Sequence, residues 1–407
     1  MKRPDAKPLG ASLPSEAEFI LACIANPAAP DSPARARALA AGMLDWDQVR
    51  RIANWHGVMP IVYRFLCANA DAAPQSFAAA MRADFFGNAL RNVGLARELA
   101  RISGELEALG IGVIALKGPA LAISAYGDLA LRQFSDLDIL IHERDLPRVA
   151  DLLAESGYYP RRYERDRPDG GYFQSSEDEF SSQDGARLID VHWRLVPSYF
   201  PFAPDADGLW ERAVRVPVEG CPVATLAPID AMMFVIAHAT KHGWPALRSV
   251  CDVAALAARA EFDFTALAAQ AAELGCMRIL LLGAALAADP GGARIAPEIL
   301  AAAAEDPHLA PLTKKIRARM FAYTGGRPKL FNEWMVPLAA IERLPNRIRY
   351  CLVRGFKPTI DDWEILALPR PLYPLYWAIR PFRLLAHHGP RLIPGARLVS
   401  ADDAVRR

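Results

Sequence analysis

Hydrophobic residues recur at helical spacing along the first part of the chain. The spacing is clear over residues 44–63, with breaks at Gly57 and Pro60, and residues 77–109 form a long Ala- and Leu-rich segment that is charged on one side. The pattern predicts an N-terminal helical region over residues 1–109. Because this region holds no cluster of reactive side chains, we expect it to be structural.

At Gly110 the helical spacing gives way to short apolar runs and to alternation. The last two runs flank Asp184-Gly185, a strong signal for a hairpin turn. In chain order, the predicted elements are a strand over 112–117, a helix over 119–126, a strand over 135–141, a helix over 145–156 and two strands over 171–183 and 186–195. Residues 110–200 are therefore predicted to form a core of β-α-β-α-β-β order.

Helical spacing returns at about residue 227 and continues to about residue 323, which predicts a helical domain over residues 201–330. Residues 331–407 form a C-terminal region rich in Pro, Arg and aromatic residues, in which we expect short helices. The fold class predicted by the whole pattern is α+β, a small mixed β-sheet embedded in a mostly helical protein.

Composition narrows the function classes. The 407 residues include 47 Lys/Arg and 46 Asp/Glu, a net charge of +1, which argues against a protein dominated by nucleic-acid binding. The longest uncharged stretches are shorter than the ~18 residues that a transmembrane helix needs, and the start lacks the apolar segment of a secretory signal. Six scattered cysteines without a CxxC pair indicate neither a zinc knuckle nor a disulfide framework, so we expect a reduced, cytoplasmic setting.

Asp136 and Asp138 stand two apart on a predicted strand, so both carboxylates face the same side. Leu137 and Ile139 face the other side, toward a core. Two adjacent carboxylates repel each other unless a cation or a proton lies between them. A magnesium ion with substrate phosphates is the natural occupant, although such a pair also occurs at loop edges and helix caps.

The strand predicted over 186–195 offers a third carboxylate. Asp190, His192 and Arg194 share one face, and apolar residues, among them Val191 and Trp193, share the other. Asp190 could ligate a metal ion together with the first pair and accept a proton from an attacking hydroxyl. A solvated sheet face would show the same pattern.

Lys117 and Gly118 lie at a predicted strand-to-helix turn. Free backbone N–H groups at such a turn attract phosphate, Gly118 allows close approach of the backbone, and Lys117 adds a positive charge. Arg132, four residues before Asp136, is a second candidate for phosphate binding.

The chain resembles the large nucleotidyltransferase family of the polymerase-β superfamily. The resemblance is carried by Arg132 and by four short stretches: LKGPAL at 116–121, YG at 126–127, SDLDI at 135–139 and DVHW at 190–193. The resemblance implies a core that binds a nucleoside triphosphate with two Mg²⁺ ions. By position, Gly118 matches the motif glycine, Asp136 and Asp138 the metal-binding pair, and Asp190 the third carboxylate. Pro119 departs from the pattern, because it stands where the superfamily usually has Ser, and the spacing from Gly118 to Asp136 is long.

The function that we expect from this resemblance is a metal-dependent transfer of a nucleoside monophosphate from a nucleoside triphosphate to an unidentified acceptor, with release of pyrophosphate. The acceptor could be a small molecule, a peptide, a lipid-linked group or RNA. Two alternatives remain open on the same fold: a non-catalytic nucleotide-binding or regulatory protein, and an RNA-directed nucleotidyltransferase toxin.

Two further patterns bear on binding. One face of a predicted helix carries His238, Lys241 and His242. These side chains would either contact nucleotide or acceptor or lie on an ordinary helix surface. A third interpretation is a zinc site formed by the two histidines. Residues 342–397 contain ten Lys/Arg against four Asp/Glu, interleaved with aromatic residues. We expect this segment to pack with its aromatic side chains buried, with contact to a polyanionic or lipid-linked acceptor as the alternative.

Overall fold

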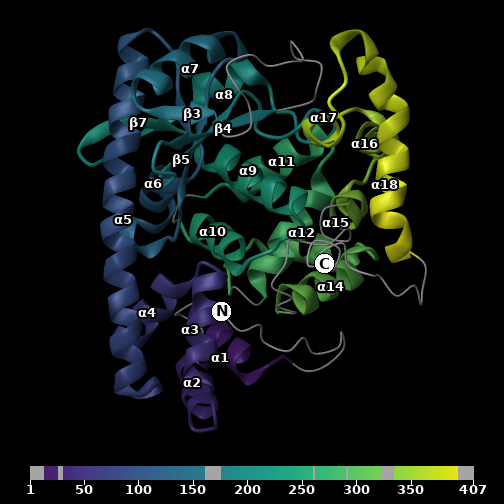
Figure 1. Ribbon diagram of the computed structural model, residues 1–407. Coiled ribbons are helices and arrows are strands. Elements are labelled where there is room, and N and C mark those ends of the chain that lie inside the picture. Colours follow the sequence, from purple (N-terminus) through teal and green to yellow (C-terminus); the bar gives the residue numbers. More distant parts are fainter. Residues whose placement is uncertain are drawn as a thin grey trace, which may run out of the picture. The chain divides into compact units, whose positions relative to one another are not determined.

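The computed structural model describes residues 13–25, 31–160, 176–259, 262–289, 292–321 and 334–392 (Figure 1). The chain divides into two compact units. Unit 1 comprises Met1–Arg162 and Ser176–Arg343, and unit 2 comprises Tyr163–Ser175 and Leu344–Arg407. The described residues combine many helices with one seven-stranded mixed sheet, which confirms the α+β class. No helix among them is long and apolar enough to cross a membrane.

Unit 1 begins with a group of helices. The helices are α1 (Ser15–Ile24), α2 (Ser32–Ala40), α3 (Trp46–Trp55), α4 (Met59–Ala68) and the 34-residue α5 (Gln75–Ala108), with a 3₁₀ turn at Ala70–Ala72. The break between α3 and α4 falls at Gly57, whose φ of +67° suits glycine and stops a helix.

The sheet contains the predicted strands and three more. Its strands are β1 (Ile114–Ala115), β2 (Asp136–Leu140), β3 (Tyr158–Pro160), β4 (Glu177–Ser182), β5 (Leu188–His192), β6 (Val214–Val218) and β7 (Cys221–Thr225), in the spatial order β3-β4-β5-β2-β1-β7-β6. Strands β2 and β5 are parallel, as are β1 and β7, and the other neighbours are antiparallel. The predicted hairpin forms at Asp184-Gly185, and the part of its first strand before residue 176 lies outside the described residues.

The sequence patterns missed β3 and the β6–β7 hairpin. Residues 214–225 carry Pro217 and Pro222, and proline ordinarily argues against a strand. Here the two prolines lie opposite each other on the hairpin, whose turn is Glu219-Gly220, and both turn residues have positive φ. This hairpin extends the sheet beyond β1.

Short elements connect the strands of the core. They are α6 (Gly118–Leu121), which continues as a π-helical turn (Ala122–Tyr126), then 3₁₀ turns at Leu129–Leu131 and Glu143–Asp145, α7 (Leu146–Glu155) and α8 (Ala206–Arg212). The predicted helices over 119–126 and 145–156 thus form nearly as expected. Gly127 ends the π-helical turn in a left-handed conformation, with φ +71°.

Helices again follow the sheet, as predicted. They are α9 (Pro228–Lys241), α10 (Leu247–Ala257), α11 (Phe264–Leu274), α12 (Met277–Ala288), α13 (Pro297–Glu305), α14 (Leu309–Phe321) and α15 (Val336–Ala340). One apolar core joins residues of α9, α10 and α12 to those of the N-terminal helices and to Ile114 and Leu140 of the sheet. A second apolar core lies on the other face of the sheet, where α5 and α7 pack against Leu137, Ile139, Ile189 and Val191.

Unit 2 contains α16 (Leu344–Phe356), α17 (Ile360–Ile365), a 3₁₀ segment (Arg370–Leu375) and α18 (Tyr376–Leu392). The expectation of short helices is wrong for α16 and α18, which have 13 and 17 residues. Two buried tyrosines, Tyr373 and Tyr376, form the small core of this unit. Trp377 and Phe382, by contrast, are 48% and 73% exposed.

Candidate active site

The site is built on the adjacent parallel strands β2 and β5. Their register places Asp138 directly opposite Asp190, and residues opposite each other in parallel strands face the same side of the sheet. The predicted alternation is confirmed by the intervening residues, because Leu137 and Ile189 are buried in the apolar core behind the sheet. One face of these two strands thus packs, and the other carries carboxylates.

Asp138 lies at the centre of a charged cluster. Its side chain is only 6% exposed, and its Oδ1 atom is 3.0 Å from the Lys117 ammonium and 3.4 Å from Nε2 of His192. Burial alone would raise the pKa of Asp138, but the positive charge of Lys117 and the contact with His192 outweigh burial and hold that pKa well below its usual value. Asp138 is therefore ionised at neutral pH.

His192 connects Asp138 to a carboxylate that the sequence patterns did not single out. Its Nδ1 atom lies 3.0 Å from Oε2 of Glu177, on the neighbouring strand β4. Burial would lower the pKa of His192, but the two flanking carboxylates outweigh burial and raise it to about 9. Burial would likewise raise the pKa of Glu177, but His192 and Lys241 hold it well below its usual value. Glu177 could have been found by pairing outward from the Asp184-Gly185 turn, because this register places Glu177 opposite His192.

The pKa of Asp190 is raised, in contrast to the lowered pKa values of Asp138 and Glu177. Its carboxyl group is half-buried beside Asp138 and Asp136. Burial first, and then the charges of Asp138 and Asp136, raise the pKa of Asp190 to about 7. A carboxyl group with a pKa near neutrality can both hold and accept a proton under physiological conditions.

Helix α9 brings further nitrogen groups to the cluster. Nε2 of His238 lies 3.2 Å from the Lys117 ammonium, and the Lys241 ammonium lies 3.8 Å from Glu177. Burial and the neighbouring charge of Lys117 lower the pKa of His238, so its imidazole is neutral. His242 is exposed, and its ring lies tilted against that of His238, with centroids 4.6 Å apart. The structure therefore brings His238 and Lys241 together with the strand residues, and His242 lies beside them.

Lys117 and Gly118 occupy the turn from β1 into α6. Gly118 has a φ of +55°, and a Cβ atom there would lie 3.3 Å from the backbone oxygen of Asp136. Glycine is thus required both by the backbone conformation and by the close approach to β2. This approach positions Lys117 for its contact with Asp138.

Arg132 lies elsewhere than the sequence analysis expected. Its guanidinium is buried and forms two hydrogen bonds with Asp252 of α10, at 2.9 and 3.0 Å, and the Tyr126 hydroxyl donates to the same carboxylate. The backbone oxygen of Arg132 accepts from Asn92 of α5. Because its donors are committed to this ion pair, Arg132 acts as a connection between the loop and two helices, and we do not retain it among the phosphate-binding residues.

Three other residues of these strands lie outside the central cluster. Asp136 is half-buried one register position from Asp138, opposite Leu188. Arg194 follows β5, is exposed and pairs loosely with Glu143 at 3.5 Å. Trp193, expected to pack in the core, is only half-buried, because β5 ends at His192.

The cluster can hold a divalent cation. Asp138, Asp190 and His192 each offer one ligand atom, and these atoms all lie within 4.8 Å of one another. Among the described residues, neither ring nitrogen of the buried His192 has a well-aligned hydrogen-bond partner. Carboxylate oxygens suit Mg²⁺ and Mn²⁺, and an imidazole nitrogen is accepted by Mn²⁺ more readily than by Mg²⁺. The two carboxylates thus fit a divalent ion, and His192 joins them as a ligand only when it loses the proton that its raised pKa favours.

The family described as "Uncharacterised nucleotidyltransferase" matches residues 42–292. Among solved structures, the chain is similar to an antigenic nucleotidyltransferase-like protein from Paracoccidioides brasiliensis, with 16% identity and a TM-score of 0.29 over 51% of this chain and 96% of that chain. No curated protein matches. The family match covers more than half of the chain and includes every residue of the charged cluster.

Proposed function

The chain belongs to this nucleotidyltransferase family, and we propose that it transfers a nucleoside monophosphate from a nucleoside triphosphate to an acceptor hydroxyl or phosphate. The observation that carries the proposal is the pairing of Asp138 with Asp190 on adjacent strands, where the two carboxylates and His192 converge. A convergence of buried ionisable groups costs stability, and groups with shifted pKa values of this kind cluster at functional sites.

The reaction has a simple balance. An acceptor oxygen forms a bond to the α-phosphorus, the bond from that phosphorus to the bridging oxygen breaks, and pyrophosphate leaves. Mg²⁺, in a two-metal arrangement held by Asp136, Asp138 and Asp190, would neutralise the negative charge that develops on the phosphates.

The residues of the cluster have separate tasks in this proposal. Asp190 accepts the proton of the acceptor hydroxyl, since its pKa of about 7 allows both protonation states near neutral pH. Lys117 and Lys241 provide positive charge for the triphosphate, with His192, His238 and His242 as additional donors. Gly118 keeps the backbone beside β2 free of a side chain.

A non-catalytic nucleotide-binding protein is the second candidate, and one observation favours it. The Lys117 ammonium already neutralises Asp138 at 3.0 Å, so the cluster is balanced without a metal ion. In addition, Pro119 removes one hydroxyl and one backbone N–H from the turn that resembles the phosphate-binding motif. This candidate predicts nucleotide binding without release of pyrophosphate.

The test is incubation of the purified full chain with each nucleoside triphosphate labelled at the α-phosphate, in the presence of Mg²⁺ or Mn²⁺ and a metabolite or RNA extract. Mass identification of the labelled product then names the acceptor class. Asp138→Asn is the inactive variant, and Asp151→Asn, an exposed aspartate on α7, is the matched control. Labelled product from the wild type and the control, but not from Asp138→Asn, supports transfer; binding alone supports the second candidate.

A further inference from the structure

Large apolar side chains are exposed far more often in unit 2 than in unit 1. Among the described residues, nineteen large apolar side chains are exposed, and eleven of them lie between residues 344 and 385. They belong to α16, α17, α18 and the segments between them: Leu344, Ile348, Leu352, Phe356, Ile365, Leu366, Leu372, Leu375, Trp377, Phe382 and Leu385. A concentration of this kind on a water-soluble surface marks an interaction site.

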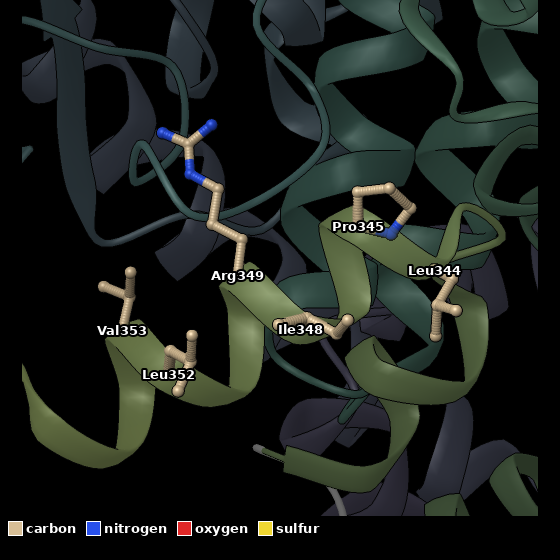
Figure 2. Close-up of a pocket in the computed structure, with 6 residues that line it drawn as sticks. All are labelled: Leu344, Pro345, Ile348, Arg349, Leu352 and Val353. Atoms are coloured by element: carbon tan, nitrogen blue, oxygen red, sulfur yellow. The ribbon is translucent and has the colours of Figure 1, made fainter.

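Helix α16 arranges three of these residues on one face. Leu344, Ile348 and Leu352 are spaced by four residues and are 65%, 52% and 54% exposed. They line a shallow groove together with Pro345, Arg349 and Val353. Figure 2 shows the Arg349 side chain extending well away from the helix, whereas the side chains of Ile348 and Leu352 lie close along it.

Helix α18 also carries exposed apolar side chains together with arginines. Trp377, Phe382 and Leu385 are 48%, 73% and 61% exposed. Neither α16 nor α18 contains an Asp or Glu, and each carries three arginines, of which Arg380 and Arg383 of α18 pair with Asp362. Over residues 344–392, eight Lys/Arg stand against three Asp/Glu, so the exposed apolar side chains lie in a segment of strongly positive charge.

We propose that unit 2 is a peripheral membrane-binding module, in which α16 and α18 lie in the plane of an anionic lipid surface. Amphipathic helices with Trp, Phe and Leu on one face and arginines beside them bind at the boundary of headgroups and acyl chains. The apolar side chains enter this boundary and the positive charge attracts anionic headgroups.

The kind of exposed side chain distinguishes lipid from nucleic acid. Single-stranded nucleic acid is bound by aromatic side chains on which bases stack, whereas eight of the eleven exposed residues here are Leu or Ile. Aliphatic side chains gain little from bases but gain fully from leaving water for an acyl layer. The proposal does not rest on the transferase function, and its test uses no nucleotide.

The experiment is co-sedimentation of the full chain with phosphatidylcholine vesicles, with and without phosphatidylglycerol. The protein should sediment with the phosphatidylglycerol vesicles and stay in solution with pure phosphatidylcholine. The double variant Leu344→Glu/Leu352→Glu should weaken partitioning about tenfold or more, because it replaces two inserted side chains by charges. Phe382→Glu on α18 provides a second, independent variant.

The matched control is Leu90→Glu/Leu109→Glu, which makes the same exchange at two exposed leucines of unit 1 and should leave vesicle binding unchanged. Circular dichroism establishes that each variant is folded. Absence of binding to anionic vesicles by the folded wild type would overturn the proposal, as would equal binding by the folded α16 variant. Light scattering that shows the wild type to self-associate through α16, or binding to single-stranded RNA in place of vesicles, would also overturn it.

Discussion

The two faces of strands β2 and β5 differ in chemistry: one is apolar and packs behind the sheet, and the other carries carboxylates beside Leu140, which belongs to the first apolar core. On one face, Leu137, Ile139 and Ile189 are at most 2% exposed and pack against the helices behind the sheet. On the other, Asp138, Asp190 and His192 form a charged cluster that is also largely shielded from water. Strand alternation therefore separates residues that hold the fold together from residues that perform chemistry, at a distance of one position along the chain.

Burial of the ionised groups on the charged face lowers the stability of the fold, and this cost indicates that the groups have a function. Its ions are stable only because they are paired: Asp138 with Lys117 and His192, and Glu177 with His192. Replacement of such a cluster by apolar residues is often neutral or stabilising. Its presence is explained by function better than by stability. A change on the charged face should lower activity, and a change on the apolar face should lower stability.

The largest expected effect is on turnover. Asp190→Asn removes the proposed proton acceptor and should reduce pyrophosphate release by about 10²–10⁴-fold. Its melting temperature should stay the same or rise, because the neutral amide ends the repulsion by Asp136 and Asp138. Pyrophosphate release and calorimetry on one preparation measure turnover and melting temperature. A destabilised but active variant would mean that the Asp190 carboxylate stabilises the fold and takes no part in the reaction.

Buried charge outside the cluster should behave as structure. Arg132→Met leaves Asp252 buried and unpaired, which should cost about 3–5 kcal/mol of unfolding free energy. The double variant Arg132→Met/Asp252→Leu should recover much of this loss. Turnover per folded molecule should remain close to wild type, and its collapse in a folded variant would return Arg132 to the site.

The apolar face is tested by Ile189→Ala, next to Asp190. Truncation of this fully buried side chain should lower the unfolding free energy by about 2–5 kcal/mol, measured by urea denaturation. The folded fraction should retain its turnover. If turnover fell far more than the folded fraction, the two faces would not be separable.

The smallest expected effect is a pH dependence. The folded pKa of Asp190 is raised from 3.8 to about 7, so the stability that the proton provides is fully present below the lower value and is lost as pH rises from there through 7. This loss amounts to at most about 1.4 kcal/mol per pH unit. A divalent ion that replaces the proton should therefore raise the melting temperature more at pH 8 than at pH 6, and Asp190→Asn should abolish this difference. An ion-induced shift that is equal at both pH values would contradict metal binding by Asp190.

Much of this arrangement is predictable from the sequence because it depends on local patterns. The alternation around Asp138 and Asp190 predicts which residues face the core and which carry the carboxylates, and Asp184-Gly185 predicts the hairpin turn. The strand order that places Asp190 beside Asp138 is a tertiary fact, as is the packing of α9 that brings His238 to Lys117.

Local patterns mislead where tertiary partners decide. Arg132 looks like a phosphate ligand until Asp252, 120 residues away, occupies its guanidinium. The β6–β7 hairpin escapes detection because its prolines lie opposite each other in a place that tolerates them. Glu177 is partly predictable from the sequence. The hairpin turn fixes its position opposite His192, but only the folded structure shows that the two side chains are in contact.

The comparison of Asp138→Asn with Leu137→Ala tests the central claim most directly, because the two residues are adjacent and face opposite sides of β2. The measurement is pyrophosphate release per folded molecule, with the folded fraction taken from denaturation of the same sample. We predict that Asp138→Asn loses turnover per folded molecule and also some stability, because Lys117 and His192 lose their partner, whereas Leu137→Ala is less stable and fully active per folded molecule. Full turnover by folded Asp138→Asn would contradict the assignment of chemistry to the charged face.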